Sequence, residues 1–243
     1  MDGKKEGIGD RYHRETKYRR EFAALAGLGA HQPLPAQEIA RKHFPLRPPD
    51  QKGGKSLWEA ITQRRSVREF SRRPISFLQI SQLIWAVQGI TLKAQGFDFR
   101  ASPSAGALYP IETYLAANRI EEIPSGLYHY EVRDARLILL REGYLGPELS
   151  LAGLGQEMLE EAAAVFVWTA VVGRSKRKYR ERAYRYIYMD AGHIGQALYL
   201  SAAALDLGCC TAGAFFDDEV DRLVGIDGKE EISVYLGAVG RVR

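Results

Sequence analysis

Three arginines and a serine stand within five residues of this sequence, at Arg64, Arg65, Ser66 and Arg68. Guanidinium groups bind phosphate oxygens through paired hydrogen bonds, and hydroxyl groups add further donors. An arginine in the last turn of a helix is also favoured by the helix dipole, which explains Arg64 and Arg65 without any ligand. Ser66 and Arg68 lie beyond the expected end of that helix. We therefore interpret the cluster as a candidate phosphate site.

A second segment, residues 103–110, places small residues between two prolines. Ser104, Ala105 and Gly106 leave room for a flat ligand against the backbone, because glycine carries no side chain. A plain turn into the next strand explains the same residues. The segment indicates a ligand site only in combination with the arginine cluster.

Two later positions could complete such a site. The backbone amide of Gly213, in an expected loop between two helices, could donate to a flavin ring nitrogen and stabilise the anionic reduced ring. Arg241 follows the last expected strand and could add a phosphate contact. An ordinary turn at Gly213 and a solvated arginine at Arg241 are the alternatives. Together with the first two segments, these positions favour a flavin mononucleotide (FMN) site.

The sequence motifs of several other kinds of functional site are absent. The chain contains no GxGxxG motif after a strand and no GxxxxGK[ST] motif, so a separate dinucleotide-binding domain is not expected. It also lacks the HExxH and GxSxG motifs. No metal site is expected, because metal-ligand spacing is absent among the histidines His13, His31, His43, His129 and His193.

The composition is that of an ordinary globular protein, with 46% hydrophobic and 26% charged residues. No apolar run approaches the roughly 20 residues of a membrane helix. The charged N-terminus has no apolar segment behind it, so we expect no secretory signal and a cytoplasmic protein. The net charge of +4 is local, since residues 173–185 alone carry +6 and the rest of the chain −2. Binding of nucleic acid is therefore not expected.

The chain divides into two expected parts. Residues 1–54 form an N-terminal arm and a linker rich in proline and glycine, including Pro33 and Pro35. Residues 55–243 form the main domain. Its patterns predict helices at 56–63, 76–88, 148–162, 187–207 and 217–224, and strands at 111–118, 127–132, 137–140, 164–172 and 232–236.

The sequence also predicts the loops and the helix ends between these elements. Residues 89–107 are expected to form loops, Gly208 is expected to stop the long helix, and Asp217–Asp218 is expected to cap the last one. Helices and hairpins alternate without regular βαβ units. The pattern therefore favours an α+β fold with a largely antiparallel central sheet flanked by helices.

In this order, the segments resemble the nitroreductase superfamily, and particularly its SagB-type dehydrogenase branch. The resemblance covers residues 56–243, with a weaker match at 13–18, and residues 103–110 are its most specific part. It implies a nitroreductase-like fold and an intertwined homodimer. One FMN would lie at each interface site, in contact with both subunits.

The resemblance also assigns roles to residues. Arg64, Ser66 and Arg68 match the family's phosphate and ribityl contacts, whereas Arg65 stands where the family varies. Many relatives carry Asn at the position of Ala107. The loop that would lie against the isoalloxazine ring, contributed by the partner subunit, consists of Pro103, Ser104, Ala105 and Gly106. Gly213 matches the amide near flavin N5, and Arg241 matches a C-terminal phosphate contact.

Lys178 and Tyr179 resemble a Lys-Tyr pair that transfers protons in azoline-oxidising relatives. Burial can shift the pKa values of both residue types into a useful range, although a solvated helix face explains the pair equally. The expected function is FMN-dependent ping-pong transfer of a hydride from NAD(P)H to a nitroaromatic, a quinone or a similar acceptor. The enzymatic alternative is oxidation of a thiazoline or oxazoline in a modified peptide. The non-enzymatic alternative is a basic module that binds polyanions through residues 174–185.

Overall fold

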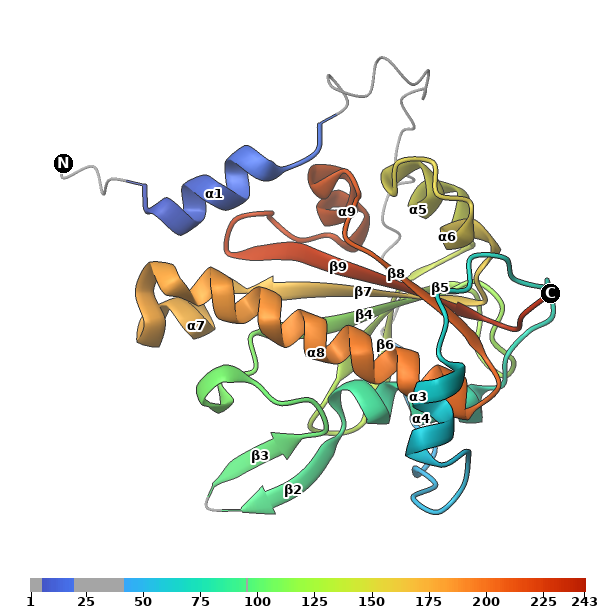
Figure 1. The fold of residues 1–243 in the computed structure, drawn as a ribbon. Helices are drawn as coiled ribbons and strands as arrows, with labels where there is room; N and C mark the ends of the chain where they lie inside the picture. Colours follow the sequence, from blue (N-terminus) through green and yellow to red (C-terminus); the bar gives the residue numbers. More distant parts are fainter. Residues whose placement is uncertain (1–5, 20–41, 95) are drawn as a thin grey trace.

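The computed structural model describes residues 6–19, 42–94 and 96–243. Its centre is a seven-stranded sheet in the order β1-β6-β5-β4-β7-β9-β8, in which every neighbouring pair is antiparallel (Figure 1). The predicted α+β class is therefore confirmed. The strands are β1 (His43–Pro45), β4 (Ile111–Ala117), β5 (Gly126–Glu131), β6 (Arg136–Glu142), β7 (Ala164–Val171), β8 (Gly208–Ala212) and β9 (Glu231–Gly240).

Helices cover both faces of this sheet (Figure 1). The central strand β7 shows why: Phe166 and Trp168 belong to one buried cluster, and Val165 and Val167 to the other. Successive side chains of a strand point to opposite faces, so an unbroken apolar strand needs a cover on each side. One face is covered by α4 (Phe77–Gln88) and α8 (Ala183–Ala204), and the other by α5 (Gly146–Ala152), α6 (Met158–Glu161) and α9 (Asp217–Val224).

Two predicted helix starts are confirmed by their caps. The side chain of Ser56 accepts a hydrogen bond from the backbone N of Glu59 at the start of α3 (Leu57–Gln63). Ser76 forms a complete capping box with Gln79 at the start of α4. These contacts satisfy backbone donors that a helix leaves open at its first turn. The end of α3 therefore places the arginine cluster directly after a fixed helix.

The segment predicted as loops at 89–107 is partly regular. It contains an antiparallel hairpin of β2 (Ile90–Ala94) and β3 (Phe97–Arg100), followed by a 3-10 turn, η2 (Ala105–Ala107). The prediction was wrong because Gly96 was read as a loop residue, whereas here it turns a hairpin with φ at +78°. This hairpin projects from the sheet beside the segment of small residues (Figure 1).

Three helix boundaries also differ from the predictions. The helix predicted at 148–162 is two short helices, because the chain turns at Gly153–Gly155. The long helix ends at Ala204, and Gly208 begins β8 instead of stopping the helix. Helix α9 starts after Phe216, so Asp217 and Asp218 occupy its first turn without capping it. Gly213 therefore follows a strand, not a helix.

The N-terminal region adds two elements to the main domain. Helix α1 (Ile8–Thr16) lies against the start of α8, and β1 pairs with β6 at the sheet edge. Pro33 and Pro35 of the predicted linker lie outside the described residues. Within the described ranges, no helix is both long and apolar enough to cross a membrane.

Candidate functional site

The arginine cluster lies where the end of α3 meets the end of α8. The chain after α3 runs parallel to β8, with Val67 N donating to Cys209 O at 2.9 Å. The hydroxyl of Ser66 is 3.0 Å from the hydroxyl of Tyr199 on α8. The guanidinium of Arg64 lies 5.3 Å from the centroid of the same tyrosine ring. Tyr199 thus anchors two of the predicted phosphate contacts.

Tyr199 also connects the cluster to β8 and the turn after it. Its hydroxyl accepts a hydrogen bond from the backbone N of Thr211 at 3.0 Å. The Thr211 hydroxyl in turn lies 2.6 Å from the hydroxyl of Tyr235 on β9. Gly213 is exposed, two residues further along the chain. Tyr199 could not be singled out from the sequence, because a tyrosine on a helix face has no motif of its own.

The arginines of the cluster carry uncompensated charge. None of Arg64, Arg65 and Arg68 forms an ion pair with a carboxylate in the described part of the chain. Arg65 instead donates to the carbonyls of Thr62 and Arg64 at 3.0 and 2.7 Å, which closes the end of α3. Arg64 and Arg65 line a cavity of 220 Å³ together with Tyr199 and Cys209. This is an arrangement suited to an anion.

Arg241 is held differently. Its Nε donates to the carbonyl of Pro74 at 2.9 Å, and its own carbonyl accepts from the backbone N of Ser71. Arg241 is not among the residues that line the 220 Å³ cavity. Within this chain, it therefore secures the segment between α3 and α4.

The segment of small residues is fixed by a buried carboxylate on α8. Asp190, only 4% exposed, accepts hydrogen bonds from Ser104 Oγ at 2.6 Å and from Ala105 N at 3.2 Å. The same Ser104 oxygen accepts from Tyr109 N at 2.9 Å. Burial raises the pKa of Asp190, against the hydrogen bonds that lower it. Sequence reasoning did not single out Asp190, because its partners lie some 85 residues away.

Gly106 faces the predicted Lys-Tyr pair. It has φ at +65°, and a Cβ atom placed there would lie 2.6 Å from Tyr179 Oη and 2.7 Å from Lys178 Nζ. Glycine is favoured at this position, because any larger residue would be strained in this conformation and would displace the ends of both side chains. The structure therefore brings the segment of small residues together with Lys178 and Tyr179 in one chain.

Backbone strain gathers around this contact. Ala107, Tyr109 and Arg180 are non-glycine residues with positive φ values of 53°, 45° and 49°. Arg180 directly follows Tyr179, where α7 (Val172–Tyr179) ends. Each such residue costs about 1–3 kcal/mol and persists only where its surroundings hold it. Strain of this kind is common at functional sites.

The two groups of predicted residues do not meet within one chain. Asp190 and Tyr199 are nine residues apart on α8, a separation of about 14 Å along the helix axis. Figure 1 shows the 3-10 turn near the start of α8 and α3 near its end. The chain therefore presents two half-sites, one with the unpaired arginines and one with Gly106, Lys178 and Tyr179.

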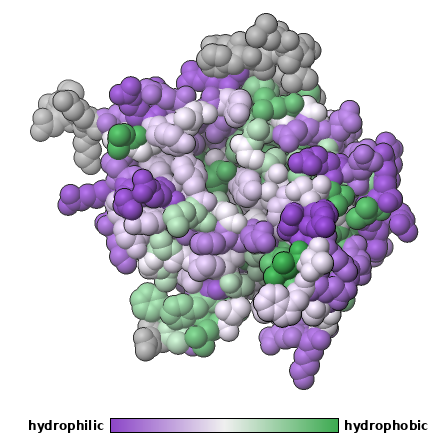
Figure 2. All heavy atoms as spheres, viewed as in Figure 1, coloured by the Kyte–Doolittle hydropathy of each residue, from purple (hydrophilic) through white to green (hydrophobic). Residues whose placement is uncertain are grey.

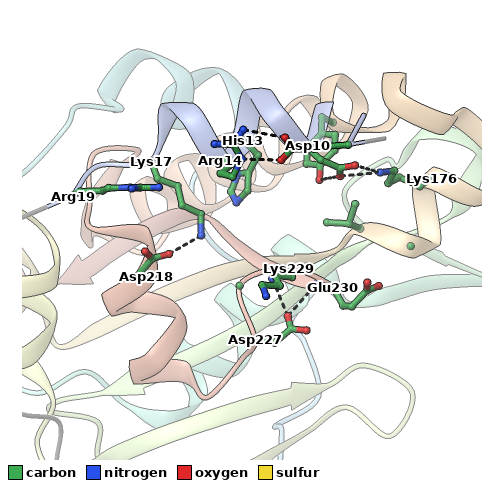
Figure 3. Close-up of a pocket in the computed structure, with 15 residues that line it drawn as sticks. Asp10, His13, Arg14, Lys17, Arg19, Lys176, Asp218, Asp227, Lys229 and Glu230 are labelled. Carbon is green, nitrogen blue, oxygen red and sulfur yellow. Dashed lines mark hydrogen bonds and ion pairs between the residues drawn. The ribbon is translucent and has the colours of Figure 1, made fainter. Parts of the chain in front are cut away.

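A third polar region lies beneath α1, where a cavity of 560 Å³ is lined by side chains of both charges. Figure 3 shows His13 of α1 and Lys17, the residue after α1, projecting into this cavity, with Lys17 directed to Asp218. Lys17 Nζ donates to Asp218 Oδ1 at 2.7 Å. Among the described side chains, no group of three or more His, Cys, Asp or Glu residues is placed to hold a metal ion here or elsewhere.

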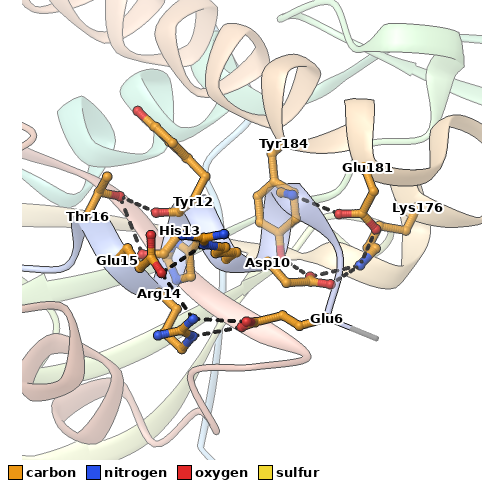
Figure 4. A network of polar contacts seen from close by, with 12 residues as sticks. Glu6, Asp10, Tyr12, His13, Arg14, Glu15, Thr16, Lys176, Glu181 and Tyr184 are labelled. Atoms are coloured by element: carbon orange, nitrogen blue, oxygen red, sulfur yellow. Dashed lines mark hydrogen bonds and ion pairs between the residues drawn. The ribbon is translucent and has the colours of Figure 1, made fainter. Parts of the chain in front are cut away.

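The contacts at α1 form a closed network (Figure 4). Asp10 accepts from Lys176 Nζ at 2.7 Å and from Tyr184 Oη at 2.6 Å. Glu181 accepts from Gly9 N at 2.8 Å and lies 3.1 Å from Lys176 Nζ. These contacts attach α1 to α7 and α8, on either side of the Lys-Tyr pair.

The chain matches known proteins over most of its length. The model of the nitroreductase family matches residues 61–241. A Methanocaldococcus jannaschii protein whose name assigns it to the nitroreductases is 34% identical over 185 residues, which are 76% of this chain and 90% of that protein.

Two solved structures share the fold. A protein of Ralstonia eutropha, also assigned to the nitroreductases by its name, superposes with a TM-score of 0.75 at 25% identity, over 89% of this chain and 97% of that one. A chain of the Escherichia coli microcin synthetase McbBCD complex, solved with truncated pro-MccB17 bound, gives a TM-score of 0.70 at 22% identity, over 97% and 92% of the two chains.

Proposed function

Because this chain belongs to the nitroreductase family and is an oxidoreductase by that membership, we propose that it uses FMN to transfer a hydride from NAD(P)H to a nitroaromatic, quinone or similar acceptor. The observation that carries the proposal is the pair of half-sites that Tyr199 and Asp190 of α8 hold in place. One half offers unpaired guanidinium groups, and the other offers a glycine surface beside a lysine and a tyrosine.

The residues present fit FMN. Arg64, Ser66 and Arg68 would hold its phosphate and ribityl chain, since their charges and hydroxyl find no carboxylate partner among the described residues. Gly106 is exposed, and its lack of a side chain leaves the backbone there accessible to a flat ring. Bound FMN would supply the acceptance of a hydride at N5 and its delivery to a second molecule.

The protein's own groups would position the reactants. Asp190 fixes the loop backbone through Ser104 and Ala105, so that the ring surface is rigid before a ligand arrives. Lys178 Nζ and Tyr179 Oη lie next to Gly106 and could deliver or remove a proton at a bound substrate. The exposed amide of Gly213 could donate to the ring.

We further propose that the two half-sites are completed by a second copy of the chain. The separation along α8 leaves each half with only part of the expected contacts. Helix α3, which ends just before Arg64, exposes three apolar side chains: Leu57 at 58%, Trp58 at 76% and Ile61 at 46%. Exposed apolar groups on one helix face are typical of a protein interface. A homodimer would cover them and join the arginines of one copy to the Gly106 loop of the other.

The proposal is tested by cofactor content and reduction. The purified protein should be yellow, bind FMN stoichiometrically, and show bleaching of the flavin absorbance with NADH or NADPH. Arg68→Gln should weaken FMN binding at least tenfold, while Arg73→Gln, another exposed arginine of the same segment, should not. A colourless protein that binds no added FMN would end the proposal.

A second candidate function is azoline oxidation in a modified peptide. It is favoured by the contact of Lys178 and Tyr179 with Gly106 and by the fold shared with a chain of the microcin synthetase complex. Here the substrate would lose two hydrogens to become an azole, and oxygen would reoxidise the cofactor. Replacing both residues with Ala should abolish azole formation and leave FMN bound. Unchanged azole formation in that variant would reject this role.

The basic segment supports an enzyme better than a polyanion-binding module. Arg174 forms an ion pair with Glu112, and Lys176 with both Asp10 and Glu181. A module that binds polyanions through an exposed stripe needs these charges free.

A further inference from the structure

A cavity of 540 Å³ opens beside the loop that carries Gly106, and residues of the β2–β3 hairpin form one of its walls. The residues that follow Gly106 form part of its wall, so the cavity and the proposed flavin surface share one stretch of backbone. The lining includes Phe97, Arg100, Ala107, Tyr109, Glu112 and Arg174.

Arg100 is a partly buried cation without an ion-pair partner. Its Nη1 donates to the neutral side chain of Gln88 at 3.0 Å, and its guanidinium lies 4.7 Å from the centroid of the Tyr109 ring. No carboxylate oxygen of the described residues lies within the 4.0 Å of an ion pair. Burial lowers the pKa of Arg100; the charge of Glu112 opposes this effect, and the charge of Arg174 adds to it. A buried charge without a partner is costly, so an anion would stabilise it.

No acid that lines this cavity forms an ion pair with Arg100 among the described residues. Glu112 is engaged by Arg174 and by His129, whose Nε2 lies 2.9 Å from Glu112 Oε2. Glu131 is paired with Arg136. Asp98 on the hairpin lines the cavity without an ion pair, but it lies beyond pairing distance of Arg100.

Two further cations lie at the rim. Arg133 and Arg177 line the cavity, are exposed, and form no ion pair with any side chain that the structure describes. On α7, Arg174, Arg177 and Lys178 lie three and four residues apart and therefore share one side of the helix. The rim of the cavity and the lysine at Gly106 thus belong to the same helix surface.

The other part of the wall is apolar. Ile90, Phe97, Leu108 and Val132 form it. On the same hairpin, next to the cavity, Leu92 is 56% and Phe99 36% exposed. Figure 2 shows hydrophobic side chains gathered where the hairpin projects from the body. Large apolar side chains exposed together favour an apolar ligand surface. The cavity therefore combines apolar walls with an unpaired guanidinium.

We propose that this cavity binds the anionic group, a carboxylate or a phosphate, of the molecule that reacts at the neighbouring flavin surface, with Arg100 as its main partner. The inference rests on the proposed function for the identity of the reaction, but not for the binding of the anion. A ligand whose anion meets Arg100 would extend along Ala107 toward Gly106, Lys178 and Tyr179. The anion could be carried by the reductant, as a nucleotide phosphate, or by the acceptor, as a carboxylate.

Direct binding tests the anion site by itself. Inorganic pyrophosphate is titrated by calorimetry into the protein saturated with FMN, so that the arginines near Tyr199 are occupied. Arg100→Gln should weaken pyrophosphate binding at least tenfold, Arg100→Lys should recover part of it, and Arg73→Gln should match the wild type. If the protein binds no flavin, the proposed function fails, but the dependence on Arg100 can still be measured. Equal binding by wild type and Arg100→Gln overturns the inference.

Matched substrates identify which reactant carries the anion. For the acceptor, 4-nitrobenzoate is compared with 4-nitrobenzamide, which differs only in lacking the charge. For the reductant, NADH is compared with 1-benzyl-1,4-dihydronicotinamide, which has no phosphate. Arg100→Gln should raise KM about tenfold for the anionic member of one pair, with kcat unchanged. An equal change for both members of each pair would show a structural role instead, and would overturn the inference.

Discussion

Two cavities of nearly equal size flank helix α7, and their charges are arranged in opposite ways. Beneath α1, in a cavity of 560 Å³, Lys176 and Lys17 each meet carboxylates of the same chain. Beside the Gly106 loop, in a cavity of 540 Å³, Arg100 meets none among the described residues. Size does not distinguish the two. They differ in whether their cations are paired with acids. The paired charges beneath α1 hold helices together, whereas the unpaired Arg100 can bind a ligand.

The reason is energetic. A partly buried ion pair holds two helices or strands together. Removing one partner leaves the other charge buried and unpaired, which destabilises the fold. A partly buried cation that no acid neutralises already bears part of that cost in the folded chain. Such a group lowers stability unless another molecule supplies the missing charge. We therefore expect substitutions beneath α1 to change stability, and substitutions at Arg100 to change binding.

The largest effect is expected for Glu112→Gln. Glu112 has a side chain only 14% exposed and pairs with both Arg174 and His129, so its loss leaves two groups unpaired. The free energy of unfolding should fall by about 3 kcal/mol. Because the cavity then gains positive charge, pyrophosphate should bind more tightly. Urea denaturation and calorimetry measure the two effects.

Glu122→Gln serves as the control for this variant, because Glu122 pairs with Arg47 at an exposed site. It should change the stability by less than about 0.5 kcal/mol and leave pyrophosphate binding as it is. If Glu112→Gln lost stability but bound pyrophosphate no better, Glu112 would not govern the charge of the cavity.

Asp10→Asn should lower the stability without changing the binding of pyrophosphate. It removes the charge that holds Lys176 and weakens the acceptor of the Tyr184 hydroxyl, both within the network of Figure 4. We expect a loss of about 2 kcal/mol in the free energy of unfolding, since hydrogen bonds to charged groups contribute about 1.5–3 kcal/mol. Pyrophosphate binding should not change.

The exposed pair of Arg11 and Glu15 on the same helix provides the control for Asp10. Glu15→Gln should leave the unfolding midpoint within error. A weaker affinity for pyrophosphate in Asp10→Asn would mean that the two cavities are coupled through α7, and the comparison would no longer hold.

His13 makes the α1 region sensitive to pH. Burial lowers the pKa of His13 to about 4, and the charge of Lys17 adds to this effect. Its ordinary pKa is about 6.5, so the unfolded chain takes up a proton first as the pH falls. The stability that neutral His13 contributes is complete above pH 6.5 and is lost between pH 6.5 and about 4.

Asp217 beside α1 acts in the opposite direction. Burial raises the pKa of Asp217 to about 6, so the folded chain takes up that proton first and gains stability as the pH falls below 6. Comparing His13→Gln with the wild type cancels this contribution. Between pH 7 and pH 5, the variant should gain about 2 kcal/mol relative to the wild type in urea denaturation. A constant difference across that range would show that His13 does not titrate in the folded state.

The sequence predicted the local features of this fold well. Ser56 and Ser76 mark helix starts because a cap depends on residues only three positions away. The strand at Ile111–Ala117 was predicted from its own β-forming residues. By contrast, β8 was missed because Cys209 and Cys210 carry no alternation, and a strand buried on both faces needs none.

The polar contacts of the candidate site could be predicted less well, because they are not local. The arginine cluster and the segment around Gly106 could be recognised in the sequence, because their residue types stand close together along the chain. That Asp190 fixes Ser104, or that Tyr199 meets Ser66, depends on how α8 crosses the sheet. The same holds for Arg100, since a lone arginine in a sequence does not reveal that no acid reaches it. Such absences become visible only in three dimensions.

The smallest expected effect concerns the rim of the Arg100 cavity. Arg133 is exposed at the tip of the β5–β6 hairpin, where water and salt screen its charge. Arg133→Gln should therefore weaken pyrophosphate binding only about twofold at low salt, and the difference should vanish near 0.5 M NaCl, where the screening length is a few ångströms. The loss in Arg100→Gln should persist at that salt concentration, because a partly buried charge is screened less. Equal salt sensitivity of the two variants would place Arg100 in solvent, and the contrast between the cavities would then rest on exposure and not on pairing.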